Sequence, residues 1–421
     1  MRLELAVFPV TDVQFGERLE LEGSRLFIDL TELQDVLSVD SRIRGVDVDI
    51  ARPGESSMAG FIFDIIEPRA RVEGASNFPG ILGPYAPTGD GTTNVLRGTA
   101  VTTLDEGSMA GGKVLVMTGD ATDASPYATL NHLVITPHVD ANESRASTMN
   151  ALKTAGLRAA TYLAETATKG KVASTVESFD LENGASRLSE SGDRLRVAFI
   201  GQVHGHQHMI ERGDHIVYGS DLVGAMPIML HPNEWLDGAV ALSYWNNHPE
   251  ETYFHQNHPV ILELYGRHQA GEITFAGTMA VVAASDEDDR ERNCMMAANL
   301  AKWTLKADAV VLTKYGGGAP HADMGQTARL CENLGMRTAV MVSDASGDRT
   351  LESAYMFNYP EVNAVVYVGG TGTQFALPVE TVMGGNPTVE AALGAMTTVA
   401  SRNVVGVANQ QGAARIRSVV W

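Results

Sequence analysis

The sequence predicts an α/β protein with a mostly β N-terminal region and a mainly parallel sheet in its C-terminal half. Up to Gly119, short apolar segments alternate with Gly, Pro, Asp and Ser turns, which is typical of strands. From Glu272 onward, apolar strands alternate with helical patterns, as they do in βαβ units. The composition, with 44% apolar residues, 19% charged residues and 42 glycines, is that of a globular protein.

In the N-terminal and central regions, the sequence pattern predicts strands, one long helix and one loop. Apolar residues at helical spacing, among them Met149, Leu152 and Leu157, predict an amphipathic helix over 144–168. The polar, turn-rich segment 176–194 is predicted to be a loop. Strands are predicted at residues 3–8, 18–21, 25–30, 46–50, 65–72, 114–117, 133–136 and 196–201.

The C-terminal half is predicted to supply the parallel sheet. Helices are expected at 286–306 and 323–334, between strands at 273–284, 308–313, 338–343 and 362–368. A chain of 421 residues exceeds what one core usually serves. We therefore expect three domains: a mostly β domain at 1–125, an α/β domain with the histidine-rich segment at 126–260, and a βαβ-type domain at 261–421.

The net charge and the cysteine content limit the binding partners and the cellular compartment that we expect for this protein. The chain has 31 Lys and Arg against 51 Asp and Glu, a formal charge of −20 that repels nucleic acid and anionic lipid. No apolar run approaches the roughly 20 residues of a bilayer span. The two cysteines, Cys294 and Cys331, cannot build a disulfide framework. We expect a cytoplasmic protein that binds neither nucleic acid nor membrane.

Several long motifs resemble one known family. They are spread from residue 10 to about residue 325 and read VTDVQFGERLELEGSRLFID (10–29), SVDSRIRGVDVDIARPGES (38–56), NFPGILG (77–83), MTGDATDASPYATLNHLV (117–134), AGLRAATYLAE (155–165), LDGAV (236–240), HQNHPVILELYGRH (255–268) and ADAVVLTKYGGGAPHADM (307–324). With these motifs the chain resembles the α subunit of component B of the glycine, sarcosine and betaine reductases.

The resemblance implies a specific chemistry. Family members with that activity cleave themselves before a cysteine and leave a pyruvoyl group, which captures the substrate amine. A partner subunit then cleaves the C–N bond. The cysteine follows the match to Asp237-Gly238-Ala239 and precedes the match to His255-Gln256-Asn257. In this chain the interval reads VALSYWNNHPEETYF (240–254) and contains no cysteine. We therefore expect an uncleaved chain without a pyruvoyl group.

Two other residues are alternatives for the missing cysteine. Ser243 lies within the interval, and a serine hydroxyl can undergo the same acyl shift through an ester. Asn293-Cys294 offers a thiol, but it lies far downstream inside a strong helical pattern, where a buried, inert cysteine is expected.

A histidine cluster suggests a metal in place of the lost electrophile. The segment GQVHGHQHMIE (201–211) contains His204, His206 and His208 at the end of an apolar strand. Alternate residues of a strand share one face, so two of these imidazoles can reach one zinc, iron or manganese ion, and all three can if the chain bends. Asp214 is a nearby carboxylate. The alternative is that the histidines are solvated or hydrogen-bonded polar residues.

Two further histidines are candidate catalytic residues. His255 and His258 lie in the family-like motif YFHQNHPVI, and nine of the twelve histidines fall between residues 204 and 268. Each can instead cap a helix before Pro259. In KYGGGAPHADM, we expect Asp323 to cap the following helix.

Three functions are compatible with these observations. The first is a subunit of a reductase-like complex that acts on a small amine-containing substrate, uncleaved and metal-dependent, together with a second reductase-family subunit. The second is a non-catalytic scaffold that docks a separately encoded catalytic partner. The third is a pyruvoyl enzyme with an unconventional cleavage residue.

Overall fold

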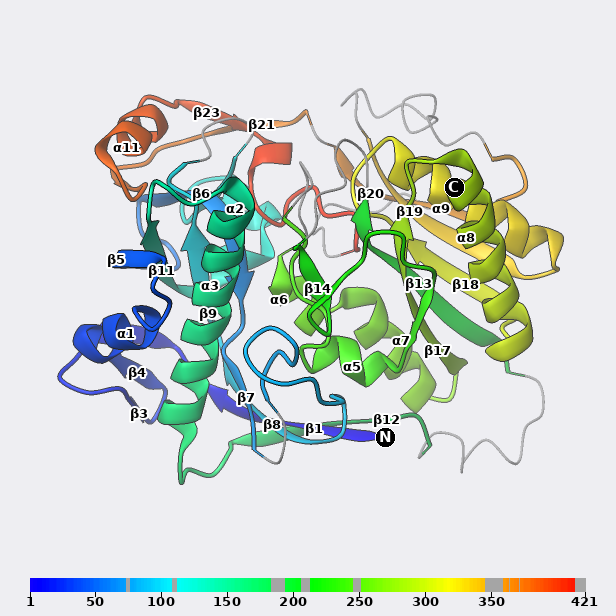
Figure 1. Cartoon of the computed structure of the whole chain (residues 1–421), viewed down its shortest axis with the longest axis horizontal. Helices are drawn as coiled ribbons and strands as arrows, with labels where there is room; N and C mark the ends of the chain where they lie inside the picture. The colour runs from blue at the N-terminus through cyan, green and yellow to red at the C-terminus, as the bar shows by residue number, and fades with distance from the viewer. Residues whose placement is uncertain are drawn as a thin grey trace.

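The computed structural model describes residues 1–72, 76–107, 112–182, 194–205, 213–244, 251–344, 359–362, 364–370 and 372–412. It confirms the predicted α/β class: several mixed sheets form the first half, and a mainly parallel sheet forms the second (Figure 1). The predicted domain bounds stay a prediction. Within the described residues, no helix is both long and apolar enough to cross a bilayer.

Two sheets form the body of the first half. One has the order β12-β1-β8-β7, made of β1 (Arg2–Pro9), β7 (Arg69–Arg71), β8 (Gly91–Arg97) and β12 (Thr175–Asp180). The other has the order β10-β6-β9-β11-β5, made of β5 (Ile43–Ala51), β6 (Ser57–Ile66), β9 (Thr99–Leu104), β10 (Lys113–Val116) and β11 (Asn131–Val139).

Smaller elements surround these sheets. They are β2 (Asp12–Phe15), β3 (Glu20–Glu22), β4 (Arg25–Ile28), α1 (Leu30–Leu37), α2 (Ala121–Ala124) and η1 (Pro126–Thr129). The chain returns to this half near its end through β21 (Gln374–Ala376), β22 (Thr381–Met383), α11 (Pro387–Gly394), β23 (Thr398–Ala400) and η4 (Ser401–Asn403), and β22 pairs with β6. In Figure 1, α11 lies above the first half accordingly.

Helix α3 (Arg145–Thr168) confirms the long helix that the apolar spacing predicts. Ser144 caps its first turn, where its side chain accepts a hydrogen bond from the backbone N–H of Ser147. The helix lies across the strands of the first half (Figure 1). Thirteen of its residues are buried, and one of them is charged, Lys153. That residue becomes central to the site.

The sheet of the second half has the order β16-β17-β13-β18-β19-β20. All its pairings are parallel except that of the edge strand β16. Its strands are β13 (Arg196–Gly205), β16 (Ile228–Leu230), β17 (Thr274–Ala283), β18 (Ala309–Thr313), β19 (Arg337–Asp344) and β20 (Ala364–Gly370).

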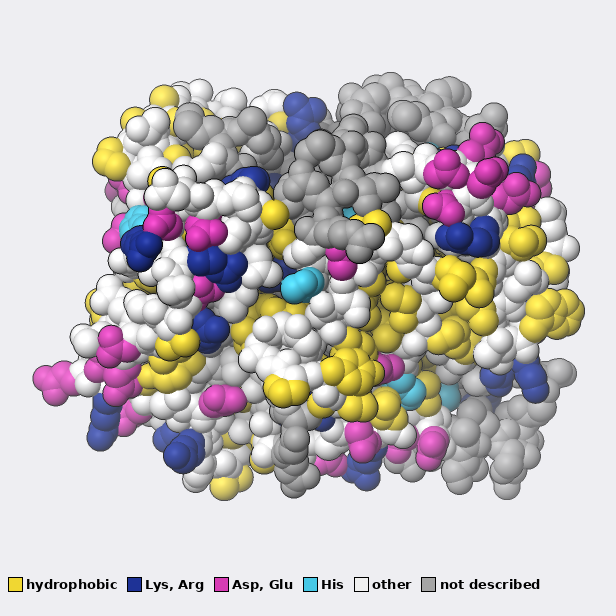
Figure 2. Space-filling model, in the orientation of Figure 1, with side chains coloured by type: hydrophobic (Ala, Val, Ile, Leu, Met, Phe, Trp, Pro, Cys, Tyr) yellow, Lys and Arg dark blue, Asp and Glu magenta, His cyan; other side chains and the backbone are white. Residues whose placement is uncertain are grey.

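Helices cover this sheet and connect it to the first half. They are α5 (Pro232–Leu236), α6 (Thr252–Gln256), α7 (Pro259–Gln269), α8 (Glu287–Asn299), which continues into the π-helical turn η3 (Leu300–Thr304), and α9 (Ala319–Asn333). A short hairpin, β14 (His215–Val217) with β15 (Ser220–Asp221), lies between the halves. Met295 and Trp303 leave apolar surface exposed on α8 and η3, in the region where Figure 2 shows yellow side chains.

Several predicted elements are wrong in position. Segment 175–180 is the edge strand β12 rather than the start of a loop, because it pairs with β1 along its whole length. The predicted strand at 65–72 is divided between the end of β6 and the short β7. Strands β8 and β9 were not predicted. Helix α9 begins at Ala319, so Asp323 lies inside the helix and is not its cap.

The packing of α3 against the sheet generates a prediction. A Cβ atom at Gly156 would lie 2.9 Å from Ile66 Cδ1 and closer still to Thr103 Oγ1. Gly156→Ala should therefore lower the free energy of unfolding by about 1–3 kcal/mol, since overpacking outweighs the gain in helix propensity. Gly266→Ala in α7 is the matched control, because no atom of the described residues lies within 4 Å of the added carbon. It should raise stability by about 0.5–1 kcal/mol. Urea unfolding of both variants measures the difference, and equal effects would contradict the close packing.

Candidate functional site

The strand order of the second half places a site at the carboxyl ends of β13 and β18. The chain passes from β13 to β17 on one side and then to β18 on the other, so the connections after β13 and β18 diverge. In open α/β sheets, ligands bind in the crevice outside such a switch point. His204 is the next-to-last residue of β13, Thr313 is the last residue of β18, and Lys314, Tyr315 and three glycines follow β18.

Ser243 is the centre of a buried polar cluster at this point. Its Oγ lies 2.5 Å from His204 Nδ1 and 2.9 Å from Asp214 Oδ2. Ser243 is fully buried, and His204 and Asp214 are almost so. Because a carboxylate only accepts hydrogen bonds, the hydroxyl hydrogen points to Asp214, and His204 Nδ1–H donates to the serine oxygen. The hydroxyl is thus fixed between an acceptor and a donor.

Asp214 is paired with the buried lysine of α3. Lys153 Nζ lies 2.9 Å from Asp214 Oδ1 and donates a second hydrogen bond of 2.9 Å to the carbonyl oxygen of His215. The ammonium also lies 4.7 Å from the centre of the Tyr244 ring. Asp214 Oδ2 accepts the backbone N–H of Tyr244 at 3.2 Å. These contacts supply the hydrogen bonds that a buried carboxylate requires.

The backbone on both sides of Ser243 is also fixed. Upstream, Ala241 N–H donates to Ile216 of β14, and Leu242 N–H donates to Thr252 Oγ1 at 3.0 Å. Thr252 in turn donates its hydroxyl and its backbone N–H to Asp64 of β6, at 2.7 and 2.8 Å. Burial raises the pKa of Asp64 to about 7, although these hydrogen bonds lower it. Both halves of the chain therefore position the Leu242–Ser243 peptide.

Tyr315 contacts the carbonyl of Ser243 from the loop after β18. Its hydroxyl donates to the Ser243 carbonyl oxygen at 2.6 Å, and its side chain is fully buried. Its backbone N–H donates to Gln202 Oε1 at 2.9 Å, and Gln202 Nε2 donates to the carbonyl of Pro320. The glutamine from β13 thereby fixes the loop that presents the tyrosine.

The predicted metal cluster is only partly described. His204 lies at the site, but His206 and His208 lie outside the described residues. A metal would have to bind His204 at Nε2, since Nδ1 is bonded to Ser243. Among the described residues, no three His, Cys, Asp or Glu side chains are grouped as a metal site. The metal assignment stays a prediction.

The structure places His255 and His258 side by side in the core near α5. Both are fully buried, with ring centres 6.0 and 5.7 Å from that of Trp235. Burial lowers the pKa of His255 to about 3 and that of His258 to about 4, so both are neutral at pH 7. Within the described part of the chain, neither nitrogen of His255 has a hydrogen-bond partner, while His258 Nε2 lies 3.2 Å from Gln411 Oε1. His258 precedes α7 without capping it through its side chain. Their catalytic role stays a prediction.

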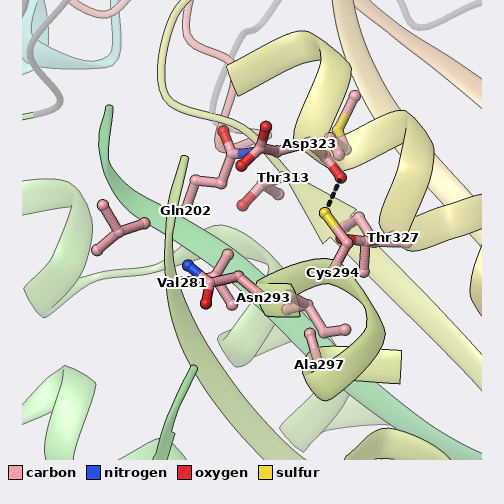
Figure 3. A pocket seen from close by; sticks show the side chains of 12 residues that line it. Gln202, Val281, Asn293, Cys294, Ala297, Thr313, Asp323 and Thr327 are labelled. Carbon is pink, nitrogen blue, oxygen red and sulfur yellow. Dashed lines mark hydrogen bonds between the residues drawn. The ribbon is translucent and has the colours of Figure 1, made fainter. Parts of the chain in front are cut away.

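A pocket lies on the other side of Gln202, between the sheet and helices α8 and α9 (Figure 3). Cys294 points to Asp323 there, with 3.4 Å between its sulfur and the Asp323 carbonyl oxygen. Burial raises the pKa of this thiol to about 12, so it stays protonated and unreactive at neutral pH. The Asp323 carboxylate instead accepts from Arg290 Nε at 2.6 Å and from Ala284 N at 2.8 Å. Cys294 is a buried residue inside α8, as expected.

The ion pair of the site generates a prediction about stability. Lys153→Met should lower the free energy of unfolding by about 3–5 kcal/mol, because it leaves the Asp214 carboxylate buried without its partner. Adding Asp214→Asn to this variant should restore part of the loss, and urea unfolding of the four proteins gives the coupling energy. Arg267→Met, which breaks the exposed pair with Glu263, is the control and should cost less than about 1 kcal/mol. If Lys153→Met and Arg267→Met lower the free energy of unfolding equally, the buried ion pair is dispensable for stability.

Comparison with known proteins agrees with the resemblance in the motifs. Residues 1–414 match the family described as glycine/sarcosine/betaine reductase component B subunits. A relative from Acetoanaerobium sticklandii, "Glycine reductase complex component B subunits alpha and beta", is 32% identical over 82% of this chain and 80% of its own.

Two relatives from Peptoclostridium acidaminophilum are named for glycine and for sarcosine reductase complexes. One with the same glycine reductase name is 32% identical over 90% of this chain and 88% of its own. "Sarcosine reductase complex component B subunit alpha" is 29% identical over 88% of this chain and 86% of its own. No solved structure matches. The family match over nearly the whole chain means that this chain belongs to the glycine/sarcosine/betaine reductase component B family.

Proposed function

We propose that this chain is a subunit of a glycine, sarcosine or betaine reductase-type complex and acts on a small amine-containing substrate together with a second subunit. The support is the family match over residues 1–414 and the names of its relatives, each of which is a component of such a complex. Glycine and sarcosine, which those names contain, are small amines that an electrophilic carbonyl can capture.

The reactive residue in this proposal is Ser243, in the interval where the resemblance implies a cysteine. The observation that carries the proposal is the contact of Ser243 Oγ with the Asp214 carboxylate at 2.9 Å. Asp214 can accept the hydroxyl proton while the oxygen attacks the carbonyl carbon of Leu242. The peptide bond then becomes an ester on Ser243. This alternative departs from the expectation of an uncleaved chain.

The residues around Ser243 fit a pyruvoyl group formed at that position. Leu242 is held by Thr252, and Tyr315 and Asp214 contact the carbonyl and the hydroxyl of Ser243. The burial of Ser243 limits hydrolysis of the ester by bulk water. A pyruvoyl carbonyl would supply the electrophile that captures the substrate amine.

Intact-mass measurement of the purified chain tests the proposal. The wild type should separate under denaturing conditions into residues 1–242 and 243–421, and the second fragment should carry a reactive carbonyl in place of a free amine. Ser243→Ala should remain a single chain of 45.0 kDa. Asp214→Asn should be cleaved at least about 100-fold more slowly than the wild type, as expected for the loss of a general base.

Ser243→Cys is the matched positive control, because its thiol supplies the nucleophile of the family. A folded wild-type chain that stays whole would contradict the proposal. If Ser243→Ala supports full reductase activity in the complex, the chain is the non-catalytic scaffold of the second hypothesis.

Metal dependence is tested separately, because it rests on the sequence alone. Elemental analysis after purification without added metal should give a divalent ion, and His206→Ala should lower its content more than His208→Ala does. Metal content should also fall below about pH 6.5, as protons compete for the imidazoles. Equal metal content in wild type and folded His206→Ala would exclude the predicted cluster.

A further inference from the structure

Tyr315 makes a contact that the acyl shift does not need. Its hydroxyl donates to the carbonyl oxygen of Ser243 at 2.6 Å, whereas the shift takes place at the preceding carbonyl, that of Leu242. Both Tyr315 and Ser243 are fully buried. A buried neutral donor aimed at this oxygen would stabilise negative charge that develops there.

Negative charge develops on that oxygen only in the step after the shift. The inference rests on the proposed self-cleavage at Ser243. In the ester, the Leu242 acyl group is bonded to Ser243 Oγ, and the Ser243 nitrogen is a free amine that has taken the proton from Asp214. Elimination removes the Cα proton of Ser243, for which the regenerated Asp214 carboxylate is available. The Cα–H electrons form the Cα–Cβ double bond, and Leu242 departs with Oγ as a carboxylate.

The remaining steps balance with one water. The enamine left at position 243 becomes an imine when a proton moves to Cβ. Water adds to the imine carbon and ammonia leaves, which gives the carbonyl group without an oxidant or a reductant. The acidity of the Cα proton controls the elimination, because the adjacent Ser243 carbonyl oxygen takes up the charge as that proton departs.

We propose that Tyr315 is a catalytic residue of self-processing that acts on the elimination step and not on the acyl shift. The Tyr315 hydroxyl stabilises the charge on the Ser243 carbonyl oxygen while the Cα–H bond breaks. The position of the tyrosine is fixed by Gln202, which accepts its backbone N–H at 2.9 Å. Asp214 thus accepts a proton in both reactions at Ser243, whereas Tyr315 acts only in the elimination.

The test is Tyr315→Phe, which removes one oxygen and should accumulate the ester. Each protein is incubated at neutral pH and then split into two portions, with and without hydroxylamine, which cleaves esters but not peptide bonds under mild conditions. Without hydroxylamine the variant should remain one chain by mass and form fragments about 100-fold more slowly than the wild type. With hydroxylamine it should separate between Leu242 and Ser243, leaving a free amine on Ser243.

Two controls make the result specific. Tyr265→Phe alters another fully buried tyrosine, whose hydroxyl donates to Asn233, and should process like the wild type. Ser243→Ala should resist hydroxylamine, since it cannot form the ester. Circular dichroism and urea unfolding establish that each variant is folded. If Tyr315→Phe does not fold, Tyr315→Leu also removes the donor and keeps an apolar side chain, and the same hydroxylamine-sensitive form should accumulate in it.

The outcomes separate this inference from the proposed function. A wild-type chain that stays whole and resists hydroxylamine overturns both. Fragments that form in Tyr315→Phe at the wild-type rate overturn the inference and leave the proposed function intact. A folded Tyr315→Phe that stays whole and resists hydroxylamine shows that the tyrosine acts on the shift, which also overturns the inference.

Discussion

The arrangement of the site depends on one buried ion pair, that of Lys153 with Asp214. Burying two charges costs several kcal/mol per ion unless their remaining hydrogen bonds are satisfied. Here the lysine also donates to the His215 carbonyl, and the carboxylate accepts from Ser243 and from the Tyr244 backbone. Because Lys153 lies on α3 of the first half, the pair joins that half to the segment that follows β13. The position of Asp214, and with it the direction of the Ser243 hydroxyl, follows from this contact.

The site is therefore assembled from segments that are distant in the sequence, and each half supplies part of it. The first half contributes Lys153 and, through Thr252, the support that Asp64 gives to Leu242. The second half contributes His204 at the end of β13 and Tyr315 after β18, where the strand order makes the two connections diverge. Contacts from both halves therefore fix Ser243 in its position.

The sequence predicts the fold better than the site for physical reasons. Local periodicity specifies α3, α8 and the strands of the second half, whereas β12 lacks a strong pattern because it is a largely exposed edge strand that pairing with β1 stabilises. His204, Asp214 and Ser243 were each singled out from local motifs, but nothing local shows that they meet. Lys153 and Tyr315 were missed, since a lysine in a helix and a tyrosine in a glycine-rich loop are ordinary surface residues until long-range packing buries them.

In the proposed reaction, Ser243 acts in place of the cysteine that the resemblance implies, and this explains why such support is needed at this position. A thiol has a pKa near 8.5 and reaches its nucleophilic thiolate form with little assistance, whereas a serine hydroxyl does not ionise in the neutral range. A serine therefore requires an acceptor for its proton within hydrogen-bond distance. Asp214, at 2.9 Å, is such an acceptor, and Lys153 fixes it there. In the proposed reaction, reactivity therefore depends on the carboxylate beside the nucleophile and not on ionisation of the nucleophile itself.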